Sequence, residues 1–428
     1  MGNIRSKESK GKKLRKRDSY VYKDDYRRPL IQFVHFSEQI LGDEREKPPK
    51  WVKELVRNLN LSEKSLANAI HRGGYKDVFV FDNAVYSFQI IKQPIEKKTV
   101  EILSDRIGGS CRYVFPQHVW FSPIVGKRYY NPTGKGGRDT DWILRFMVGK
   151  METCVEGDMW DYVYERWRYN EPLDDLRFNV IYMMHDLIES MLMLHSQQIF
   201  LLDIKPENII GCKPCAEDGQ EVGKRTIQWK FTDLDPSFIY DRYKMDNGEQ
   251  FRWIRTLPYI PTFERPHHRV ELKRNDAFAL MKTFMFYITF VFSDTKVANS
   301  IKIINTAEFN YMRDKGLTDA RRMRDLALLK NNDFGKKFQS LMEKIESLYY
   351  LCLNYRADKV NDRYITSRTI NSELTSMKFE CKAYIKKFNS TGKWGDEVDN
   401  SPSRKYKRLI KRTAPIPLRT KSSVKFKF

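Results

Sequence analysis

The chain has 428 residues, of which 41% are hydrophobic and 13% aromatic, and it carries a net charge of +22. This composition excludes a chain that is disordered throughout, because enough apolar residues are present to bury a core. The longest apolar run, residues 277–292, is interrupted by Lys282 and falls short of the roughly 20 residues that cross a bilayer, so no transmembrane helix is expected.

The positive charge is concentrated at the two ends of the chain. Residues 1–17 carry +7 and residues 404–428 carry +10, which leaves +5 for the residues between them. We expect basic ends of this kind to direct the protein to a location or to dock it on a partner, and not to contribute to the fold.

The first six residues, Met-Gly-Asn-Ile-Arg-Ser, fit the pattern for N-myristoylation at Gly2. One acyl chain binds a membrane only marginally, so we expect the basic residues that follow to contact anionic lipid as a second signal. This predicts a location at the cytoplasmic face of a membrane. The alternative is an unmodified arm that binds nucleic acid or directs the protein to the nucleus, with the protein in the cytoplasm or nucleus.

The six cysteines predict free thiols in a reducing, intracellular setting, because they are scattered and no secretory signal precedes them. Cys212 and Cys215 form a lone C-x-x-C. A structural zinc site needs a second pair of ligands at suitable spacing, so this motif favours an ordinary loop.

In chain order, the residue pattern predicts five segments. They are a basic arm (1–29), a helical extension (30–70), a strand-rich unit (71–154), a helical unit (155–388) and a basic tail (389–428). The strand-rich unit contains a hairpin over 78–91 that turns at Asp82-Asn83 and a further strand over 143–151. The helical unit contains an amphipathic helix over 177–196, a helix over 277–292 that is apolar all round and therefore buried, and further helices through Ile385.

Residues 194–210 read Leu-His-Ser-Gln-Gln-Ile-Phe-Leu-Leu-Asp-Ile-Lys-Pro-Glu-Asn-Ile-Ile and carry the chemistry of the helical unit. Asp203 could take a proton from a hydroxyl, Lys205 could neutralise a phosphate, and Asn208 could hold a divalent ion. A second carboxylate, Asp233, follows a short β-like run. Phosphoryl transfer needs these groups, because its catalysis consists mostly of positioning and charge neutralisation.

The stretch resembles the catalytic loop of the protein kinase superfamily, H-R-D-L-K-P-E-N, with Leu201 and Leu202 at the His and Arg positions. Asp233-Leu234-Asp235 resembles the D-F-G triplet, and residues 256–261 resemble the segment that closes the activation loop. Asp276 stands where the family has an Asp that braces the catalytic loop. His195, on the preceding helix, is expected to be a packing residue.

The strand-rich unit carries weaker matches to the same family. Gly73 and Val78 match the phosphate-covering loop G-x-G-x-x-G-x-V, and Lys92 in Gln-Ile-Ile-Lys resembles the lysine of V-A-I-K. The resemblance implies that Lys92 contacts the α- and β-phosphates and pairs with Glu101, or with Glu96 instead. In the hinge-like residues 151–160, the backbone at Glu152 and Cys154 would face adenine, and Asp158 would reach the ribose.

The resemblance thus implies an α+β, bilobal protein kinase-like fold that binds ATP and Mg2+ between its lobes. Lys205 matches the Ser/Thr pattern, so the implied activity is transfer of the γ-phosphate to hydroxyls of a protein substrate. Asp203 would act as the base, Lys205 would stabilise the phosphoryl group, and Asn208 and Asp233 would hold the metal. Without an arginine at position 202, activity is not expected to wait for phosphorylation of the activation loop.

Three alternatives remain open from the sequence. The missing glycines, the Asp235 substitution and the absent His-Arg pair fit a catalytically impaired pseudokinase scaffold. A small-molecule phosphotransferase of related fold is the second alternative. The third is a nucleic-acid-binding protein that uses its basic tails, whose affinity would fall steeply with salt.

Overall fold

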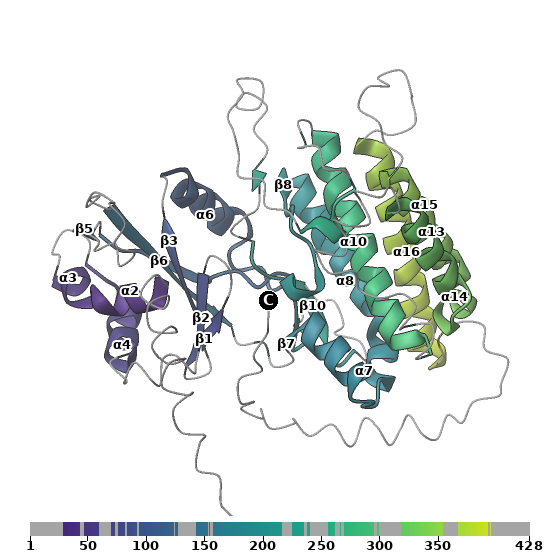
Figure 1. Ribbon diagram of the computed structural model, residues 1–428, viewed down its shortest axis with the longest axis horizontal. Helices are drawn as coiled ribbons and strands as arrows, with labels where there is room; N and C mark the ends of the chain where they lie inside the picture. The colour runs from purple at the N-terminus through teal and green to yellow at the C-terminus, as the bar shows by residue number, and fades with distance from the viewer. Residues whose placement is uncertain are drawn as a thin grey trace, which may run out of the picture. The chain divides into compact units, whose positions relative to one another are not determined.

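A computed structural model of the protein shows a mixed α+β chain whose strands form small antiparallel sheets (Figure 1). This confirms the expected α+β class. The structure describes residues 29–42, 47–59, 70–72, 76–81, 84–91, 94–123, 125–126, 143–152, 154, 157–215, 225–234, 238–239, 256–261, 266, 269–294, 298, 318–353, 367–392 and 394.

The chain divides into two compact units. Within the described residues, unit 1 covers those from 29 to 109 and from 116 to 152, and unit 2 covers 110–115 and those from 154 to 394. The division after Thr153 lies one residue before the boundary expected from the sequence. The short segment Ser110–Phe115 belongs to unit 2 although its neighbours on both sides belong to unit 1.

Unit 1 is built on an antiparallel sheet with the strand order β1-β2-β3-β6-β4, and β5 also pairs with β6. The strands are β1 (Ile70–Arg72), β2 (Lys76–Phe81), β3 (Ala84–Ile91), β4 (His118–Phe121), β5 (Val125–Gly126) and β6 (Ile143–Glu152). Phe81 pairs with Ala84 across the β2–β3 turn, which confirms the predicted hairpin. The strand expected over 143–151 is confirmed as β6.

Among the described residues, the helices that accompany this sheet are α2 (Pro29–His35), α3 (Ser37–Gly42), α4 (Lys50–Leu59) and α6 (Pro94–Ile107). The ring of Phe33 on α2 packs 5.2 Å from that of Phe88 and 5.6 Å from that of Phe146, measured between centroids. The buried Asp77 carboxylate accepts a 3.0 Å hydrogen bond from the backbone N–H of Leu30, in the first turn of α2. The helices before the sheet and the sheet itself therefore share one hydrophobic core.

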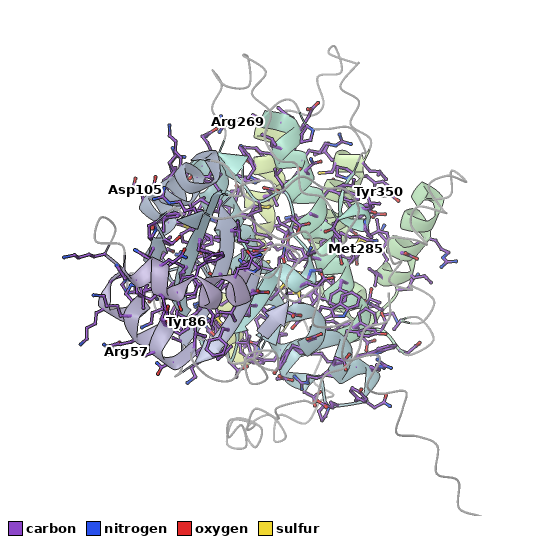
Figure 2. The ribbon with its side chains drawn as sticks, turned by 60° about the vertical axis from the view of Figure 1, so that its left-hand side comes forward. Arg57, Tyr86, Asp105, Arg269, Met285 and Tyr350 are labelled. Atoms are coloured by element: carbon purple, nitrogen blue, oxygen red, sulfur yellow. A yellow bond between two sulfur atoms is a disulfide. The ribbon has the colours of Figure 1, made fainter. Side chains whose placement is uncertain are left out.

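Unit 2 is mainly helical, with α10 buried at its centre. Its helices are α7 (Arg166–Arg168), α8 (Asp174–Ser196), α10 (Arg269–Phe292), α13 (Thr318–Lys330), α14 (Asp333–Lys337), α15 (Gln339–Leu353) and α16 (Ser367–Thr391), and a π-helix, η1, spans Asp161–Glu165. Within the predicted apolar run, every residue from 277 to 281 and from 283 to 292 is buried, as expected for a helix that is apolar all round. The four polar residues just before the run, 273–276, are buried as well, which the run did not predict. Figure 2 shows Met285 inside unit 2 and Arg269 at the beginning of α10.

Two small sheets of unit 2 flank the sequence stretch that carries the candidate chemistry. One has the order β10-β9-β7, formed by β7 (Gly157–Asp158), β9 (Ile209–Cys212) and β10 (Gln228–Phe231). The other pairs β8 (Ile199–Phe200) with β11 (Phe238–Ile239). Among the described helices, none is long and apolar enough to cross a membrane.

The expectation of free cysteines is wrong for four of the six. Cys111 forms a disulfide with Cys215, and Cys154 forms one with Cys212, while the buried Cys352 and Cys381 are free thiols. Both bonds lie within unit 2. The pairs were missed because their members lie 104 and 58 residues apart in sequence, and only the fold brings them together. Free cysteines therefore no longer support the inference of a reducing compartment.

The two disulfides make a direct prediction about thiol chemistry. Alkylation of the denatured, unreduced protein is expected to label Cys352 and Cys381 only, and prior reduction is expected to expose all six thiols. Intact mass measures both numbers. Reduction should also lower the free energy of unfolding by about 2–4 kcal/mol per bond, because each bond restricts the unfolded chain. Labelling of six thiols without a reductant would contradict the pairing.

Candidate functional site

The candidate site is a loop in unit 2 that joins β8 to β9. After Phe200 the chain leaves β8, passes through Asp203 and Lys205, and forms the 3-10 turn η2 (Pro206–Asn208) before β9 begins at Ile209. Pro206 starts the turn, where its fixed φ and missing N–H are tolerated. Strand pairing on both sides fixes the two ends of this loop.

The carboxylate of Asp203 is the centre of a hydrogen-bonded cluster. Thr256 Oγ1 donates to Oδ1 at 2.6 Å, Lys205 Nζ donates to Oδ2 at 2.8 Å, and Asn208 Nδ2 donates to Oδ2 at 3.1 Å. Lys205 Nζ also donates to Thr256 Oγ1 at 3.2 Å. The structure therefore brings together three residues expected from the sequence, Asp203, Lys205 and Asn208. The cluster also includes Thr256, which the sequence predicted only as part of the segment that closes the activation loop.

Asp276 on α10 holds the backbone that leads into Asp203. Its carboxylate accepts the N–H of Leu201 at 2.9 Å and the N–H of Leu202 at 2.8 Å, which confirms the expected brace. Leu202 has a φ of 63°, in the left-handed region that costs a non-glycine residue about 1–3 kcal/mol. The two hydrogen bonds to the buried carboxylate of Asp276 stabilise this conformation of Leu202.

His195 does more than pack. It is fully buried at the end of α8, and its Nε2 lies 2.9 Å from Asp276 Oδ2. The sequence expectation of a packing residue is therefore incomplete, because the ring also orients the carboxylate that braces the loop. No spacing rule could have revealed this contact, since His195 and Asp276 are 81 residues apart.

The two expected metal ligands lie on neighbouring segments. The backbone N–H of Thr232 donates to the carbonyl of Asn208 at 3.0 Å, which fixes the residue before Asp233 against the loop. Asp233 is half-buried and left-handed, with a φ of 58°. Asn208 Nδ2 also donates to the carbonyl of Asp203 at 2.8 Å, so its Oδ1 is the atom that could face a cation.

These two oxygen ligands fit Mg2+, which typically takes one or two protein oxygens and completes its shell with phosphate and water. Within the described ranges, no group of three or more His, Cys, Asp or Glu residues is arranged to hold a metal by itself.

Asp158 lies in β7, and β7 pairs with β9, the strand that follows the loop. Its Oδ1 accepts the backbone N–H of Asp161 at 2.8 Å, so the side chain caps the helical turns that follow. Burial raises the pKa of Asp158 from 3.8 to about 7, and the charges of Asp161 and Glu207 add to this effect. Asp158, which the sequence predicts to contact a ribose, caps a helix in the structure.

The raised pKa of Asp158 predicts how stability depends on pH. The folded state holds the proton more tightly than the unfolded state, so this contribution to stability is fully present below about pH 4 and is lost as the pH rises through about 7. Asp158→Asn should flatten the fall in the free energy of unfolding across this window, because Asn keeps the cap without titrating. Urea unfolding at several pH values measures the slope. The exposed Asp105→Asn is the matched control, and an unchanged slope in Asp158→Asn would contradict the assignment.

The remaining expected site residues are only partly described. Val78 is half-buried in β2, Glu101 is exposed on α6, and Glu152 ends β6. Cys154 is half-buried, and its side chain forms the disulfide with Cys212. Residues that lie outside the described ranges are Gly2, Gly73, Lys92, Asp235 and both basic ends.

Comparison of the chain with models of known protein families finds no matching family, and comparison with curated proteins finds no match.

Proposed function

We propose that the protein is a divergent Ser/Thr protein kinase that transfers the γ-phosphate of ATP to hydroxyl groups of a protein substrate with the help of Mg2+. One observation carries the proposal: Asp203 is held by Thr256, Lys205 and Asn208 on a loop that Asp276 braces from a buried helix. This arrangement supports the kinase resemblance of the loop, because the residues proposed as base, cation and metal ligand lie within one hydrogen-bonded cluster.

In the proposed reaction, bound Mg2+-ATP supplies the phosphoryl group and neutralises part of its charge. Asp203 orients the substrate hydroxyl and accepts its proton, and Thr256 keeps the carboxylate in place by donating to Oδ1. Lys205 places its ammonium group beside the transferring group. Asn208 and Asp233 provide oxygen atoms for the metal.

The other expected contacts with ATP remain proposals. Unit 1 would correspond to the small lobe of a kinase and unit 2 to the large helical lobe. Lys92, paired with Glu101, would contact the phosphates, and Gly73 and Val78 would cover them. The backbone at Glu152 and Cys154 would face adenine. Asp158 would contact the ribose.

The test is Mg2+-dependent transfer of labelled phosphate from ATP to a generic protein substrate, with wild type compared with Lys92→Ala. Transfer that exceeds the level of the variant, and that is abolished by a chelator, would support the proposal. A wild-type rate no higher than that of Lys92→Ala would overturn it. Binding of ATP, measured separately, then distinguishes a nucleotide-binding relic from a protein that binds no nucleotide.

A pseudokinase scaffold is the second candidate, and the buried pair Leu201 and Leu202 favours it. These side chains are 6% and 5% exposed and offer no charged group, where the resembled family has His and Arg. However, Asp203, Lys205 and Asn208 are retained in the same loop and are joined there by hydrogen bonds. This candidate predicts ATP binding without transfer.

Thr256 offers a sharper test of the cluster. Thr256→Val keeps the shape of the side chain but removes the donor to Asp203 and the acceptor for Lys205. Hydrogen bonds to charged groups contribute about 1.5–3 kcal/mol, so the rate of transfer should fall by about 10- to 100-fold if they persist in the transition state. Thr256→Ser keeps the hydroxyl and should stay within about threefold of wild type. Steady-state rates measure both variants, and equal impairment by Val and Ser would show that the hydroxyl is not the relevant group.

A further inference from the structure

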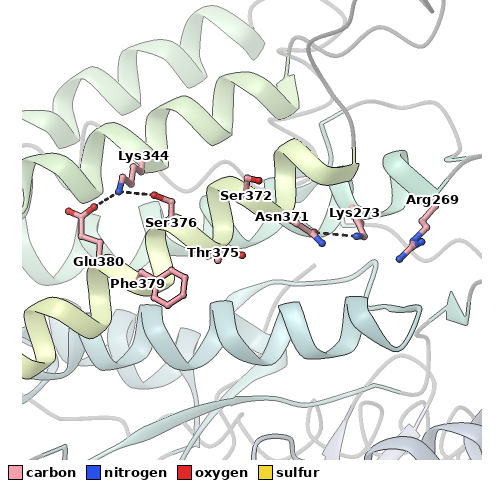
Figure 3. Close-up of a pocket in the computed structure, with 9 residues that line it drawn as sticks. All are labelled: Arg269, Lys273, Lys344, Asn371, Ser372, Thr375, Ser376, Phe379 and Glu380. Carbon is pink, nitrogen blue, oxygen red and sulfur yellow. Dashed lines mark hydrogen bonds and ion pairs between the residues drawn. The ribbon is translucent and has the colours of Figure 1, made fainter.

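A groove of about 960 Å³ lies in unit 2, along one face of α16 (Figure 3). None of its lining residues belongs to the site described above. The groove is lined by Arg269 and Lys273 of α10, Lys344 of α15, and Asn371, Ser372, Thr375, Ser376, Phe379 and Glu380 of α16. The α16 residues recur at intervals of three and four, which places them on one helix face. Four of these six side chains carry hydroxyl or amide groups, so the face is equipped to form hydrogen bonds.

Lys273 is the unusual residue of this groove. It is only 2% exposed, yet its Nζ donates to a neutral acceptor, Asn371 Oδ1, at 3.2 Å. A buried ammonium group is costly unless an opposite charge compensates it. Among the described residues, no carboxylate lies within ion-pair distance of Lys273. The pKa of Lys273 is lowered from 10.5 to about 8, mainly by burial and in addition by the positive charge of Arg269.

Arg269 increases the uncompensated positive charge at the same end of the groove. It precedes Lys273 by one turn of α10, so the two side chains leave the helix on the same side. Its Nε is buried and has no hydrogen-bond partner within the described part of the chain. Arg269 also begins a helix of 24 residues, whose N-terminal end attracts negative charge.

The opposite end of the groove is already neutral. Lys344 Nζ lies 2.6 Å from a carboxylate oxygen of Glu380 and donates to Ser376 Oγ at 3.0 Å. Figure 3 shows this pair at one end of the row of lining residues and Arg269 and Lys273 at the other. Within the described ranges, the positive charge that lacks a carboxylate partner is therefore confined to one end of the groove, where Ser372 and Thr375 also line it.

We propose that the Arg269–Lys273 end of this groove binds a phosphate group, with Asn371, Ser372 and Thr375 as additional hydrogen-bond donors. A phosphate provides several acceptor oxygens for the two cations and satisfies the buried Nε of Arg269. Asn371 accepts from Lys273 through Oδ1 and keeps Nδ2 free for the ligand. The phosphate comes either from a small soluble molecule or from a phosphorylated residue of this chain.

The experiment titrates the full-length protein with sodium phosphate and measures the thermal midpoint, with sodium chloride at matched ionic strength as the reference. Wild type should be stabilised by phosphate beyond chloride. Lys273→Met and Arg269→Gln should each weaken the apparent affinity by about 10- to 100-fold, since each removes a charged hydrogen bond. Lys344→Met is the matched control in the same groove and should bind within about threefold of wild type, because Glu380 already neutralises this lysine.

Lys273→Met is expected to fold, because it replaces a buried unpaired charge by an apolar chain of similar length. Arg269→Gln, at the end of the helix, provides a second test if it does not. Phosphatase treatment separates the two sources of phosphate: binding by untreated protein identifies a soluble ligand, and binding only after treatment identifies a phosphorylated residue of this chain. No binding before or after treatment, or equal loss in Lys273→Met and Lys344→Met, would overturn the proposal.

Discussion

Asp203→Ala is expected to lower the rate of phosphoryl transfer by about 10²–10⁴-fold, the usual contribution of a general base. The carboxylate lies in a fixed position because Thr256, Lys205 and Asn208 all donate to it. In the proposed reaction its removal leaves the substrate hydroxyl without a proton acceptor, and it leaves Lys205 without its ion-pair partner. Initial rates at saturating ATP and Mg2+ measure the loss.

Two further variants separate chemistry from folding at this position. Asp203→Asn keeps the size of the side chain and one oxygen for Thr256, yet it cannot accept a proton, so it should be nearly as slow as Asp203→Ala. Asp105→Ala removes an exposed carboxylate on α6 and should leave the rate unchanged. Rates for Asp203→Asn within threefold of wild type would exclude Asp203 as the base.

The secondary structure near the site was largely predictable from the sequence. Alternating β-formers around Asp82-Asn83 predicted the hairpin, and an apolar run predicted the buried helix that became α10. In the hairpin the alternation reflects burial of one face, and in α10 the apolar run reflects burial on all sides, so both patterns can be recognised in a single chain. The loop residues Asp203, Lys205 and Asn208 were predictable because they are close in sequence.

Long-range partners were not predictable, because sequence distance carries no information about them. Thr256 reaches Asp203 across 53 residues, and His195 reaches Asp276 across 81. The disulfides were missed for the same reason. Lys273 was also missed, because it precedes the predicted apolar run and a lysine is rarely buried in a folded protein. Features that depend on tertiary contacts therefore need the structure.

The second large effect is expected for Asp276→Ala, which should lower the free energy of unfolding by about 2–6 kcal/mol. The two N–H groups of Leu201 and Leu202 would each lose a buried acceptor, at about 1–3 kcal/mol apiece. Leu202 would also lose the contacts that hold it in the left-handed region. Urea unfolding measures the loss.

His195→Gln provides the matched comparison for Asp276→Ala. It removes the ring that contacts Asp276 but leaves both backbone hydrogen bonds, so its cost should be smaller than that of Asp276→Ala. The double variant should be less destabilised than the sum of the two single changes, because both alter one network. Additive costs would show that His195 and Asp276 act independently, and a change below about 0.5 kcal/mol for Asp276→Ala would refute the brace. The backbone N–H groups of Leu201 and Leu202 therefore fix the loop that carries Asp203, although the buried side chains at both positions carry no charge.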